Sequence, residues 1–355
     1  MRILYLVHSF NYGGAENHVL DLANSMTVMG NEVFILTRKG RLAERLKDEV
    51  TISDLKMSDL LFPLVLLRIC RFIRRNRIEI IHAHKRLPIL LASLAGKIMK
   101  IPVVATVHGQ PRIDLRSPFS RRFPDRVIFV SRRLLNGKGS YREVGERALF
   151  IQNGVEATDP AENRDPASLC YISRIDRKHS SVIGMVIKEV MPEIIKFFPG
   201  ISFHILGDGE FLDELRQYGA KFNAEAGREA CVIHGYVKDV KPVAARAGLV
   251  LGVGRVALES LVAGVPVLSV NSEFLGDFIT RENYSFFKAN NFVAAGNDPP
   301  DASRLRDLIL LYLSNPGGFR EEALALRENI LSDFGIMKIS GQILEVYRQL
   351  SAITR

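Results

Sequence analysis

The residues best suited to chemistry lie in one segment, 252–266, which reads GVGRVALESLVAGVP. An apolar run at 248–251 precedes its Gly-x-Gly turn, and a helical pattern with one carboxylate, Glu259, follows the turn. Glycines let backbone N–H groups approach an anion closely, and the start of a helix carries partial positive charge. The segment therefore predicts a phosphate-binding turn, with Glu259 placed to hold a pair of hydroxyls.

Two further glycine turns follow predicted strands. Residues 11–16 read NYGGAE, and residues 206–210 read LGDGE. Open α/β sheets bind ligands beyond the carboxyl ends of their strands, so these turns predict a ligand cleft. The first turn lacks the spacing Gly-x-Gly-x-x-Gly, so a dinucleotide-binding fingerprint is not supported.

A basic loop, 173–178, reads SRIDRK and follows a predicted strand. Arginine offers a planar fork for phosphate oxygens, and lysine offers a mobile point charge. Arg174 and Lys178 could therefore neutralise a diphosphate without a metal ion. An isolated basic loop is more often simply solvated, and that alternative stays open.

Histidines gather at or near the ends of predicted strands in the first half of the chain: His8, His82, His84 and His108. We expect His82 and His84 to point to opposite faces of their strand. No cysteine or carboxylate cluster completes a ligand set around them, so no metal site is predicted. His108 lies where a strand opens, and it is either ligand-facing or a hydrogen-bonded structural residue.

Alternating strands and helices must position these residues. In the first half, β-rich runs at 3–7, 32–36, 78–82, 103–107 and 127–130 alternate with helical patterns near 15–28, 62–76, 87–99 and 132–143. The second half has runs at 169–172, 202–206, 231–233, 249–251 and 267–270, separated by helices. This alternation is typical of doubly wound parallel sheets, so we predict an α/β protein with two Rossmann-like domains.

The predicted boundaries are 1–156 for an N-terminal domain, 157–335 for a second domain and 336–355 for a C-terminal helix. The segment 156–167 is rich in Asp, Pro, Ala and Asn, which is typical of a linker. An apolar stripe at 339–350 is suited to docking, and we expect the helix to pack back on the first domain.

The composition of the chain favours a globular protein in a reducing compartment. The 355 residues, 47% of them hydrophobic, are enough for two cores. Three scattered cysteines, Cys70, Cys170 and Cys231, argue against a disulfide framework and favour the cytoplasm. No run reaches the roughly 18 apolar residues that span a bilayer, so any membrane contact is expected to be peripheral.

Charge is distributed unevenly along the chain. Residues 1–150 hold 26 Lys and Arg against 13 Asp and Glu, whereas the remainder is slightly acidic. This asymmetry points to an anionic partner, such as a membrane surface, a phosphorylated substrate or nucleic acid. Arginines cluster in a helical pattern at 63–77 and in a second stretch, at Arg112, Arg116, Arg121 and Arg122. A merely solvated basic face is the alternative.

Taken in order, these motifs resemble the family 4 glycosyltransferases, which are retaining enzymes of the GT-B fold. The matching motifs are GGAE at 13–16, IIHAH at 80–84, TVHG at 106–109, NGV at 153–155, SR at 173–174 with Lys178, LGDGE at 206–210, HGYV at 234–237 and the block 252–266.

The resemblance implies the partners of the protein. A nucleotide-diphospho-sugar donor binds mainly to the second domain, and a glycan or lipid-linked acceptor binds mainly to the first. No cofactor, metal ion or nucleic acid is implied. The expected role is synthesis of a surface polysaccharide or glycolipid, in the cytoplasm or at an anionic membrane surface on its inner face.

The resemblance also implies the roles of single residues. His108 is similar to the histidine that faces the donor sugar, Arg174 and Lys178 resemble the clamp on the diphosphate, and Glu259 resembles the carboxylate that holds the ribose. These four are the expected catalytic residues. The other expected donor-binding residues are Gly13, Gly14, Gly207, Gly209, His234, Gly235, Tyr236, Gly252, Val253, Gly254, Arg255 and Val256.

The chain departs from the family pattern beside Glu259. The family's Glu-x7-Glu motif ends at Glu259, but its first glutamate would fall at Leu251, and Arg255 replaces a residue that is usually apolar. The interval from Arg174 to the lysine is one residue shorter than usual, so Arg177 could share the clamp. Two other functions therefore stay open: a nucleotide-sugar 2-epimerase, which needs no acceptor, and a catalytically inactive scaffold of the same fold.

Overall fold

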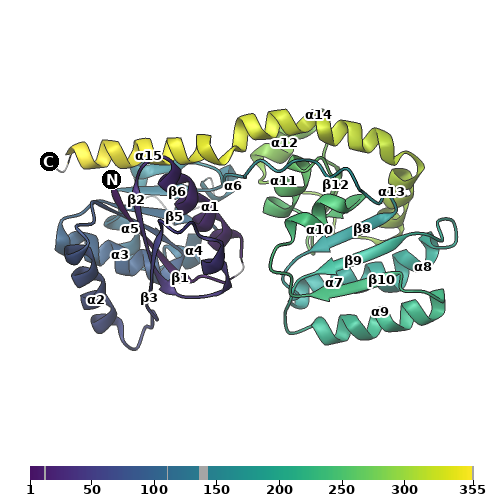
Figure 1. Cartoon of the computed structure of the whole chain (residues 1–355), viewed down its shortest axis with the longest axis horizontal. Coiled ribbons are helices and arrows are strands. Elements are labelled where there is room, and N and C mark those ends of the chain that lie inside the picture. Colours follow the sequence, from purple (N-terminus) through teal and green to yellow (C-terminus); the bar gives the residue numbers. More distant parts are fainter. Residues whose placement is uncertain (12, 110, 136–142, 354–355) are drawn as a thin grey trace. The chain divides into compact units, whose positions relative to one another are not determined.

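The computed structural model describes the whole chain except residues 12, 110, 136–142 and 354–355. The chain forms two compact units (Figure 1). Unit 1 consists of Met1–Glu156 together with Phe334–Arg355, and unit 2 consists of Ala157–Asp333. The chain therefore passes from one unit to the other twice.

Unit 1 contains a parallel sheet of seven strands among its described residues, in the order β3-β2-β1-β4-β5-β6-β7. The strands are β1 (Arg2–Ser9), β2 (Glu32–Arg38), β3 (Thr51–Asp54), β4 (Ile80–His84), β5 (Val103–Val107), β6 (Arg126–Phe129) and β7 (Ala148–Phe150). The connecting elements are α1 (Gly14–Val28), α2 (Phe62–Arg75), α3 (Arg86–Met99), α4 (Pro111–Asp114), α5 (Pro118–Arg122), α6 (Arg132–Leu135) and the 3₁₀ turns η1 (Arg41–Arg45) and η2 (Gly145–Arg147). The predicted helix at 132–143 is described only as far as Leu135, and most of its remainder lies outside the described residues.

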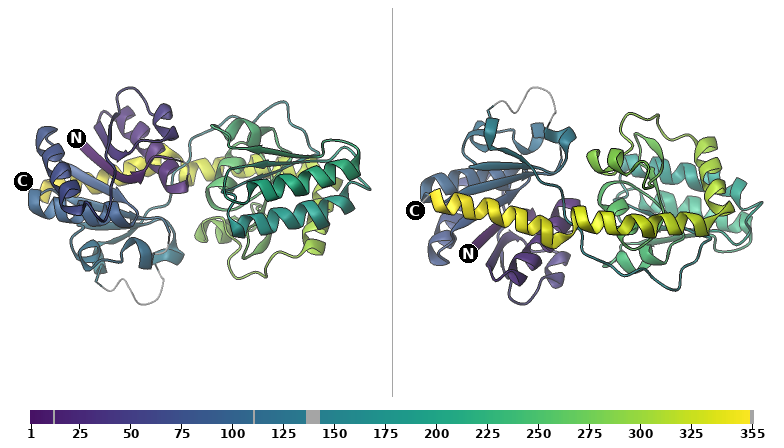
Figure 2. Two further views of the ribbon diagram at one scale, coloured as in Figure 1. Left: turned by 90° about the horizontal axis from the view of Figure 1, so that it is seen from below. Right: turned by 90° about the horizontal axis from the view of Figure 1, so that it is seen from above.

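Helices cover both faces of this sheet, so central strands such as β4 and β5 are buried along their whole length. Leu4 and Ile81 face a core shared with α2 and α3, whereas Ile3 and Ile80 face a second core. The second core includes Ile339, Ile343 and Tyr347 of α15 (Ile336–Ile353). The C-terminal helix thus packs on unit 1, as expected: it runs along one side of the unit in Figure 1, and it lies behind the unit in the left view of Figure 2 and in front of it in the right view.

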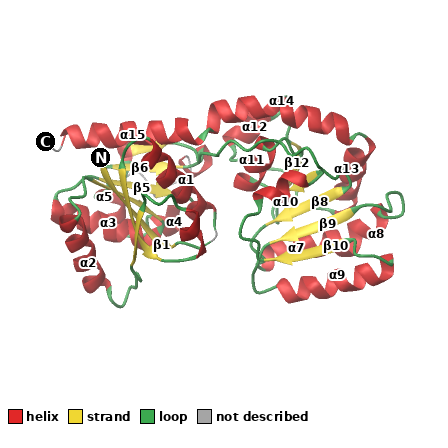
Figure 3. Cartoon of the chain, viewed as in Figure 1, coloured by secondary structure: helices red, strands yellow, loops and turns green. Residues whose placement is uncertain are grey.

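Unit 2 repeats the scheme with six described strands, in the order β10-β9-β8-β11-β12-β13. The strands are β8 (Ser168–Ile172), β9 (Ser202–Leu206), β10 (Cys231–Gly235), β11 (Leu249–Leu251), β12 (Val267–Val270) and β13 (Leu275–Phe278), and only the last of these pairs antiparallel. The helices are α7 (Arg177–Met185), the π-helix η3 (Val186–Val190), α8 (Met191–Ile194), α9 (Leu212–Ala226), α10 (Lys241–Arg246), α11 (Gly254–Val262), α12 (Tyr284–Ala289), α13 (Ala302–Ser314) and α14 (Pro316–Phe334) (Figure 3).

Both sheets reverse their strand order at one point, between β1 and β4 in unit 1 and between β8 and β11 in unit 2. In doubly wound sheets the loops at such a switch point separate and leave room for a ligand beyond the carboxyl ends of the strands. The two predicted domains are therefore α/β units, and each has one natural binding edge.

Candidate functional site

The predicted site residues fall into two groups, one in each unit. His108, Gly13 and Gly14 belong to unit 1, and all the other predicted residues belong to unit 2. In unit 2, the loops after β8 and β11 leave the same edge of the sheet, because these two strands pair in parallel with Leu251 beside Tyr171. The first loop carries Arg174, and the second carries the glycine turn.

The glycine turn of unit 2 opens α11. Gly254 is the first residue of the helix and has a φ of +59°, which favours glycine, and Val253 at the N-cap makes no side-chain capping hydrogen bond. The first N–H groups of this helix therefore have no cap side chain to accept from them, which is the state that suits an anion. Gly252 packs against Val256, which also lines a small pocket beside the helix.

Glu259 already has a partner in this structure. Its Oε1 lies 2.8 Å from Nε of Arg255, one helical turn earlier, and the two side chains are 18% and 12% exposed. Glu259 lines the same small pocket as Val256, together with Thr158, Lys241 and Ser260. The carboxylate is thus held in place and faces a hollow, and the unusual arginine of the family block is what holds it.

The predicted diphosphate clamp also carries a partner. Lys178 Nζ lies 2.9 Å from Oε1 of Glu273, and this hydrogen bond and the charge of Glu273 raise the pKa of Lys178. Both side chains are exposed, so the pair contributes little to stability and leaves Lys178 available to another anion. Asp176 caps α7 by accepting from the N–H groups of Lys178 and His179, while Arg174 is exposed.

The glycines of the 206–210 turn pack against the Arg174 loop. A Cβ at Gly207 would lie 1.8 Å from the carbonyl oxygen of Ser173, and one at Gly209 would lie 2.3 Å from that of Ile175. The N–H of Ile175 donates to the carbonyl of Asp208. These glycines therefore fix the position of the loop that carries Arg174.

The predicted base-reading segment lies at the end of β10. His234 is exposed and stacks on His204, with Nε2 and Nδ1 of the two rings 3.0 Å apart. The carbonyl of Gly235 accepts from Gly207 N–H, and Tyr236 is half-buried. Gly235 thus joins this segment to the 206–210 turn.

Leu251 does not belong to the site surface. Its side chain is fully buried in the core of unit 2, where it packs with residues such as Leu249 and Phe203. The position at which the family carries its first glutamate is therefore occupied by a core side chain, and no carboxylate stands there.

In unit 1, the glycine pair opens α1 beside a buried ion pair. Gly14 has open space around the position of its missing Cβ, whereas a Cβ at Gly13 would collide with the carboxylate of Glu16. Glu16 is buried and is paired with Lys85, which follows β4. Lys85 has a φ of +69°, a strained conformation for a non-glycine residue, and such strain clusters at functional sites.

The prediction that His82 and His84 point to opposite faces was wrong. Residues two apart on a strand share a face, and the two ring centroids are 4.3 Å apart in the interior. His82 is hydrogen-bonded to Thr106 and to Tyr347 of α15. Within the described part of the chain, no group of three or more His, Cys, Asp or Glu side chains is arranged to hold a metal ion.

His108, directly after β5, is hydrogen-bonded to His84 at the end of β4, with Nε2 and Nδ1 2.9 Å apart. Burial lowers the pKa of His84 well below its usual value, and neighbouring His82, His108, His18 and Lys85 lower it further. The sequence did not predict this hydrogen bond, nor the ion pairs of Lys85 with Glu16 and of Lys178 with Glu273. The partners are distant in sequence, and the only available signal was that each lies at or near the end of a strand.

Two family models match the chain. Residues 12–159 match Glycosyltransferase Family 4, and residues 166–309 match Glycosyl transferases group 1. The chain therefore belongs to the glycosyltransferases of the family 4 type, as its motifs predicted.

Two of the curated relatives act on lipids, according to their names. Phosphatidyl-myo-inositol mannosyltransferase of Mycobacterium tuberculosis is 22% identical over 96% of this chain and 94% of its own length. One component of the phosphatidylinositol N-acetylglucosaminyltransferase of Arabidopsis thaliana is 26% identical over 61% of this chain and 55% of its own length.

Solved structures confirm the fold. HepE of Anabaena in complex with UDP superposes with a TM-score of 0.74 at 18% identity, over 98% of this chain and 100% of that one. A glycosyltransferase from Rickettsia africae gives a TM-score of 0.72 at 16% identity, with 98% of both chains covered. The predicted GT-B fold is therefore confirmed.

Proposed function

We propose that this glycosyltransferase is a retaining, metal-independent enzyme that moves a sugar from a nucleotide-diphospho-sugar to a lipid-linked acceptor or glycan. The observation that carries the proposal is the grouping at one edge of unit 2. The loops after β8 and β11 bring Arg174, Lys178, the start of α11 and Glu259 to the carboxyl ends of neighbouring strands. UDP bound by HepE and the family resemblance support a nucleotide at this edge.

The chemistry follows from where charge develops. As the glycosidic bond breaks, negative charge grows on the departing diphosphate, and preorganised cations and helix N–H groups stabilise it there. Arg174, Lys178 and the start of α11 would supply that charge without a metal ion. Glu259 would hold the ribose, and the carboxylate missing at Leu251 leaves the sugar to be recognised by other groups. Retention of the anomeric configuration is proposed from the family resemblance.

The acceptor side of the proposal concerns the surface of α2. Val65, Ile69 and Ile73 bury one face of this helix, but Leu64 and Leu67 are 58% and 55% exposed on another. Leu60, just before the helix, is 93% exposed. Apolar side chains interspersed with arginines suit the interface of an anionic membrane.

The names of both relatives include a phosphatidylinositol lipid, and a lipid acceptor would suit an enzyme that binds a membrane through α2. We therefore propose a lipid-linked acceptor presented at the inner face of a membrane. None of the described helices is both long enough and apolar enough to cross a membrane.

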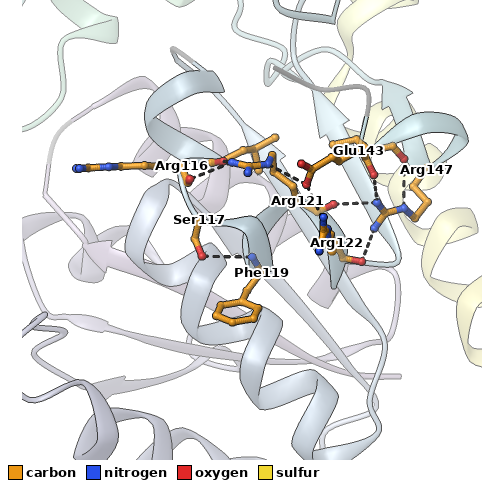
Figure 4. Close-up of polar contacts among 9 residues, drawn as sticks. Arg116, Ser117, Phe119, Arg121, Arg122, Glu143 and Arg147 are labelled. Atoms are coloured by element: carbon orange, nitrogen blue, oxygen red, sulfur yellow. Dashed lines mark hydrogen bonds and ion pairs between the residues drawn. The ribbon is translucent and has the colours of Figure 1, made fainter. Parts of the chain in front are cut away.

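The second arginine cluster divides into structural and exposed members (Figure 4). Arg121 donates to the carbonyls of Leu115 and Arg116, each at 3.0 Å, and to Glu143 at 3.1 Å. Arg147 locks the same turn by donating to several backbone carbonyls. The side chain of Arg121 therefore stabilises the fold of this segment, whereas the side chain of Arg116 points away from these hydrogen bonds in Figure 4.

The proposal is tested with a panel of UDP- and GDP-sugars and extracted lipid acceptors in the presence of EDTA. We expect acceptor-dependent release of the nucleoside diphosphate and a product with the anomeric configuration of the donor, as read by NMR. Abolition by EDTA with rescue by magnesium or manganese would contradict the metal-free clamp. A changed sugar still attached to its nucleotide would identify an epimerase, and absence of any turnover would favour an inactive scaffold.

The clamp itself makes a separate prediction. Arg174→Ala and Lys178→Ala should each lower turnover at least tenfold while changing the affinity for the nucleoside much less, because the diphosphate charge grows in the transition state. Glu273→Gln is the matched control, since it removes the partner of Lys178 without removing the cation. An equal loss of turnover in that control would mean that the ion pair, and not the free lysine, is what the enzyme needs.

A further inference from the structure

Unit 1 contains a polar hollow with a volume of about 240 Å³, and none of the predicted site residues lines it. Arg86, Arg116, Ser117 and Ser120 supply its polar donors, and Asp59 is the one carboxylate among the described residues around it. A water molecule occupies about 30 Å³ in the liquid, so the hollow has room for several waters or for a small anionic group.

The hollow exists because two short helices connect β5 to β6. The helices α4 and α5 have four and five residues, and both pack against α3. They cover less of α3 than one long helix would, so Leu87 and Leu90 near the start of α3 line the hollow. All the lining residues belong to unit 1, so the hollow is a feature of that unit alone.

The two arginines of the hollow differ in what they bind. With the described residues, the guanidinium of Arg116 forms no hydrogen bond or ion pair, and in Figure 4 it points away from Arg121 and its partners. Arg86 donates from Nη2 to Oδ2 of Asp59 at 2.9 Å. Both members of this pair are largely exposed, so the pair contributes little to stability and another anion can replace the carboxylate. Each guanidinium offers a planar fork that matches two phosphate oxygens.

The turn that carries Arg116 and Ser117 is held in place before any ligand arrives. Arg121 donates to the carbonyls of Leu115 and Arg116. Oγ of Ser117 accepts from the N–H of Phe119 at 3.3 Å, as Figure 4 shows. This bond uses a lone pair of the hydroxyl, so its O–H can still donate to an anion. A preorganised hydroxyl and backbone reduce the entropy that an anion would lose on binding.

The residues beside the hollow indicate that its anion belongs to a lipid. Leu60 directly follows Asp59, and Phe119 lies between Ser117 and Ser120 in the sequence; both side chains are exposed, as is Ile113 of α4. A free phosphate gains nothing from apolar neighbours. The phosphate of a lipid lies next to acyl chains, so cations and hydroxyls beside exposed apolar side chains match both parts of the molecule.

We propose that this hollow binds the phosphoryl group of a membrane lipid, with Arg86 and Arg116 on the phosphate oxygens and the exposed apolar side chains beside the acyl chains. The inference rests on the proposed function only for the membrane that supplies the lipid, and it requires no transfer of sugar. Binding releases Asp59 from Arg86, because the phosphate and the carboxylate compete for one guanidinium.

Calorimetric titration of the full-length protein with a soluble lipid tests the site. The probe is dihexanoyl phosphatidic acid, kept below the concentration at which it forms micelles, with no nucleotide-sugar present. Arg116→Gln should weaken binding about tenfold or more, because a hydrogen bond between charged groups is lost. Lys56→Gln is the matched control, since Lys56 is exposed in the loop that carries Asp59 but does not line the hollow. Its equal loss of charge should change the affinity by less than about twofold.

Asp59→Asn should have the opposite effect. It removes the carboxylate that competes for Arg86, so the lipid should bind about threefold more tightly. Most of this gain should disappear when Arg86→Gln is combined with it, because no guanidinium is then left to release. A gain of the same size in that double variant would mean that Asp59 does not compete for Arg86, and it would overturn the role of Arg86.

Glycerol 3-phosphate tests the source of the phosphate, because it lacks acyl chains. It should bind at least about tenfold more weakly than the lipid, since each buried CH₂ group contributes about 0.8 kcal/mol. Equal affinities would assign the hollow to a free phosphate and overturn the lipid. An unchanged affinity in Arg116→Gln, or an equal loss in Lys56→Gln, would overturn the site itself. Failure of the proposed function looks different: the lipid would still bind with these dependences, but no nucleotide-sugar would be turned over.

Discussion

The chain departs from the family pattern at Arg255, and this departure gives Glu259 an ion-pair partner. Arg255 holds the carboxylate of Glu259 from a position that is usually apolar. We expect Glu259→Ala to weaken nucleotide binding by one to two decades, because a hydrogen bond to a charged group is worth about 1.5–3 kcal/mol. Calorimetric titration of the nucleotide measures this.

Arg255→Met is the control for that titration, since it removes the ion pair and keeps the carboxylate. Nucleotide affinity should then fall less than in Glu259→Ala, because the carboxylate stays but loses the side chain that holds it. If Arg255→Met weakened binding as much as Glu259→Ala, the pair would serve the stability of α11 and the ribose role would be wrong. Glu259→Ala also leaves Arg255 largely buried without its carboxylate, so the fold of each variant is checked by circular dichroism.

Single residues were predictable where they belong to a compact motif. Gly254, Glu259 and Lys178 each lie within a short segment whose residue types already indicate anion binding. Their partners were not predictable, because Lys178 and Glu273 are 95 positions apart and Lys85 and Glu16 are 69 apart. Such pairs form only because parallel strands bring the loops after them to one edge of the sheet.

At the scale of elements, α2 carries the membrane proposal. Leu64→Ser with Leu67→Ser should weaken binding to anionic vesicles about tenfold or more, since each leucine would bury apolar surface in the bilayer. Replacing Arg71 and Arg74 by serine should weaken vesicle binding by a similar amount at low salt, because each charge contributes about 1 kcal/mol. Vesicle binding should then also depend less steeply on the salt concentration. Co-sedimentation with vesicles of defined composition provides the measurement.

Leu311→Ser is the matched control, because Leu311 is 53% exposed on α13 of unit 2 and should have no effect. Equal partitioning of the wild type onto neutral and anionic vesicles would contradict the electrostatic part of the proposal. A loss of binding in the Leu311 variant would show that any exposed leucine contributes, and the surface of α2 would lose its special role.

Most strands were predictable, and the three that were missed lie at edges of the two sheets. Buried strands such as β4 and β5 are dense in β-branched and apolar residues, so their positions were correct to within a few residues. The missed strands, β3, β7 and β13, have three or four residues each and little alternation. They form by pairing with a strand that is already part of a sheet, so their own residues do not indicate that they are strands.

For the whole molecule, the buried histidines predict how stability changes with pH. Burial lowers the pKa of both His82 and His84 below the ordinary value near 6.5, so the unfolded chain binds more protons than the folded one. The free energy of unfolding of unit 1 should be highest above about pH 6.5 and should fall below it, by up to about 1.4 kcal/mol per pH unit for each histidine.

Hydrogen–deuterium exchange during urea unfolding measures this stability and separates unit 1 from unit 2. His84→Leu should remove one of the two contributions and reduce the slope between pH 6.5 and 5.5. A stability of unit 1 that stays constant over this range would contradict the prediction and would mean that the unfolded state does not gain the expected protons.

Unit 1 is assembled from the two ends of the chain, and this has a consequence for the order in which the protein can form at the ribosome. Tyr347 and its neighbours on α15 fill a core that begins with Ile3 and Tyr5. The first 156 residues therefore emerge without the helix that covers one face of their sheet. At about 5–20 residues per second, roughly 10 to 35 s pass while unit 2 is translated. Unit 2 is a continuous segment and can complete its fold first, so the half of the molecule that is made first is the half that is finished last.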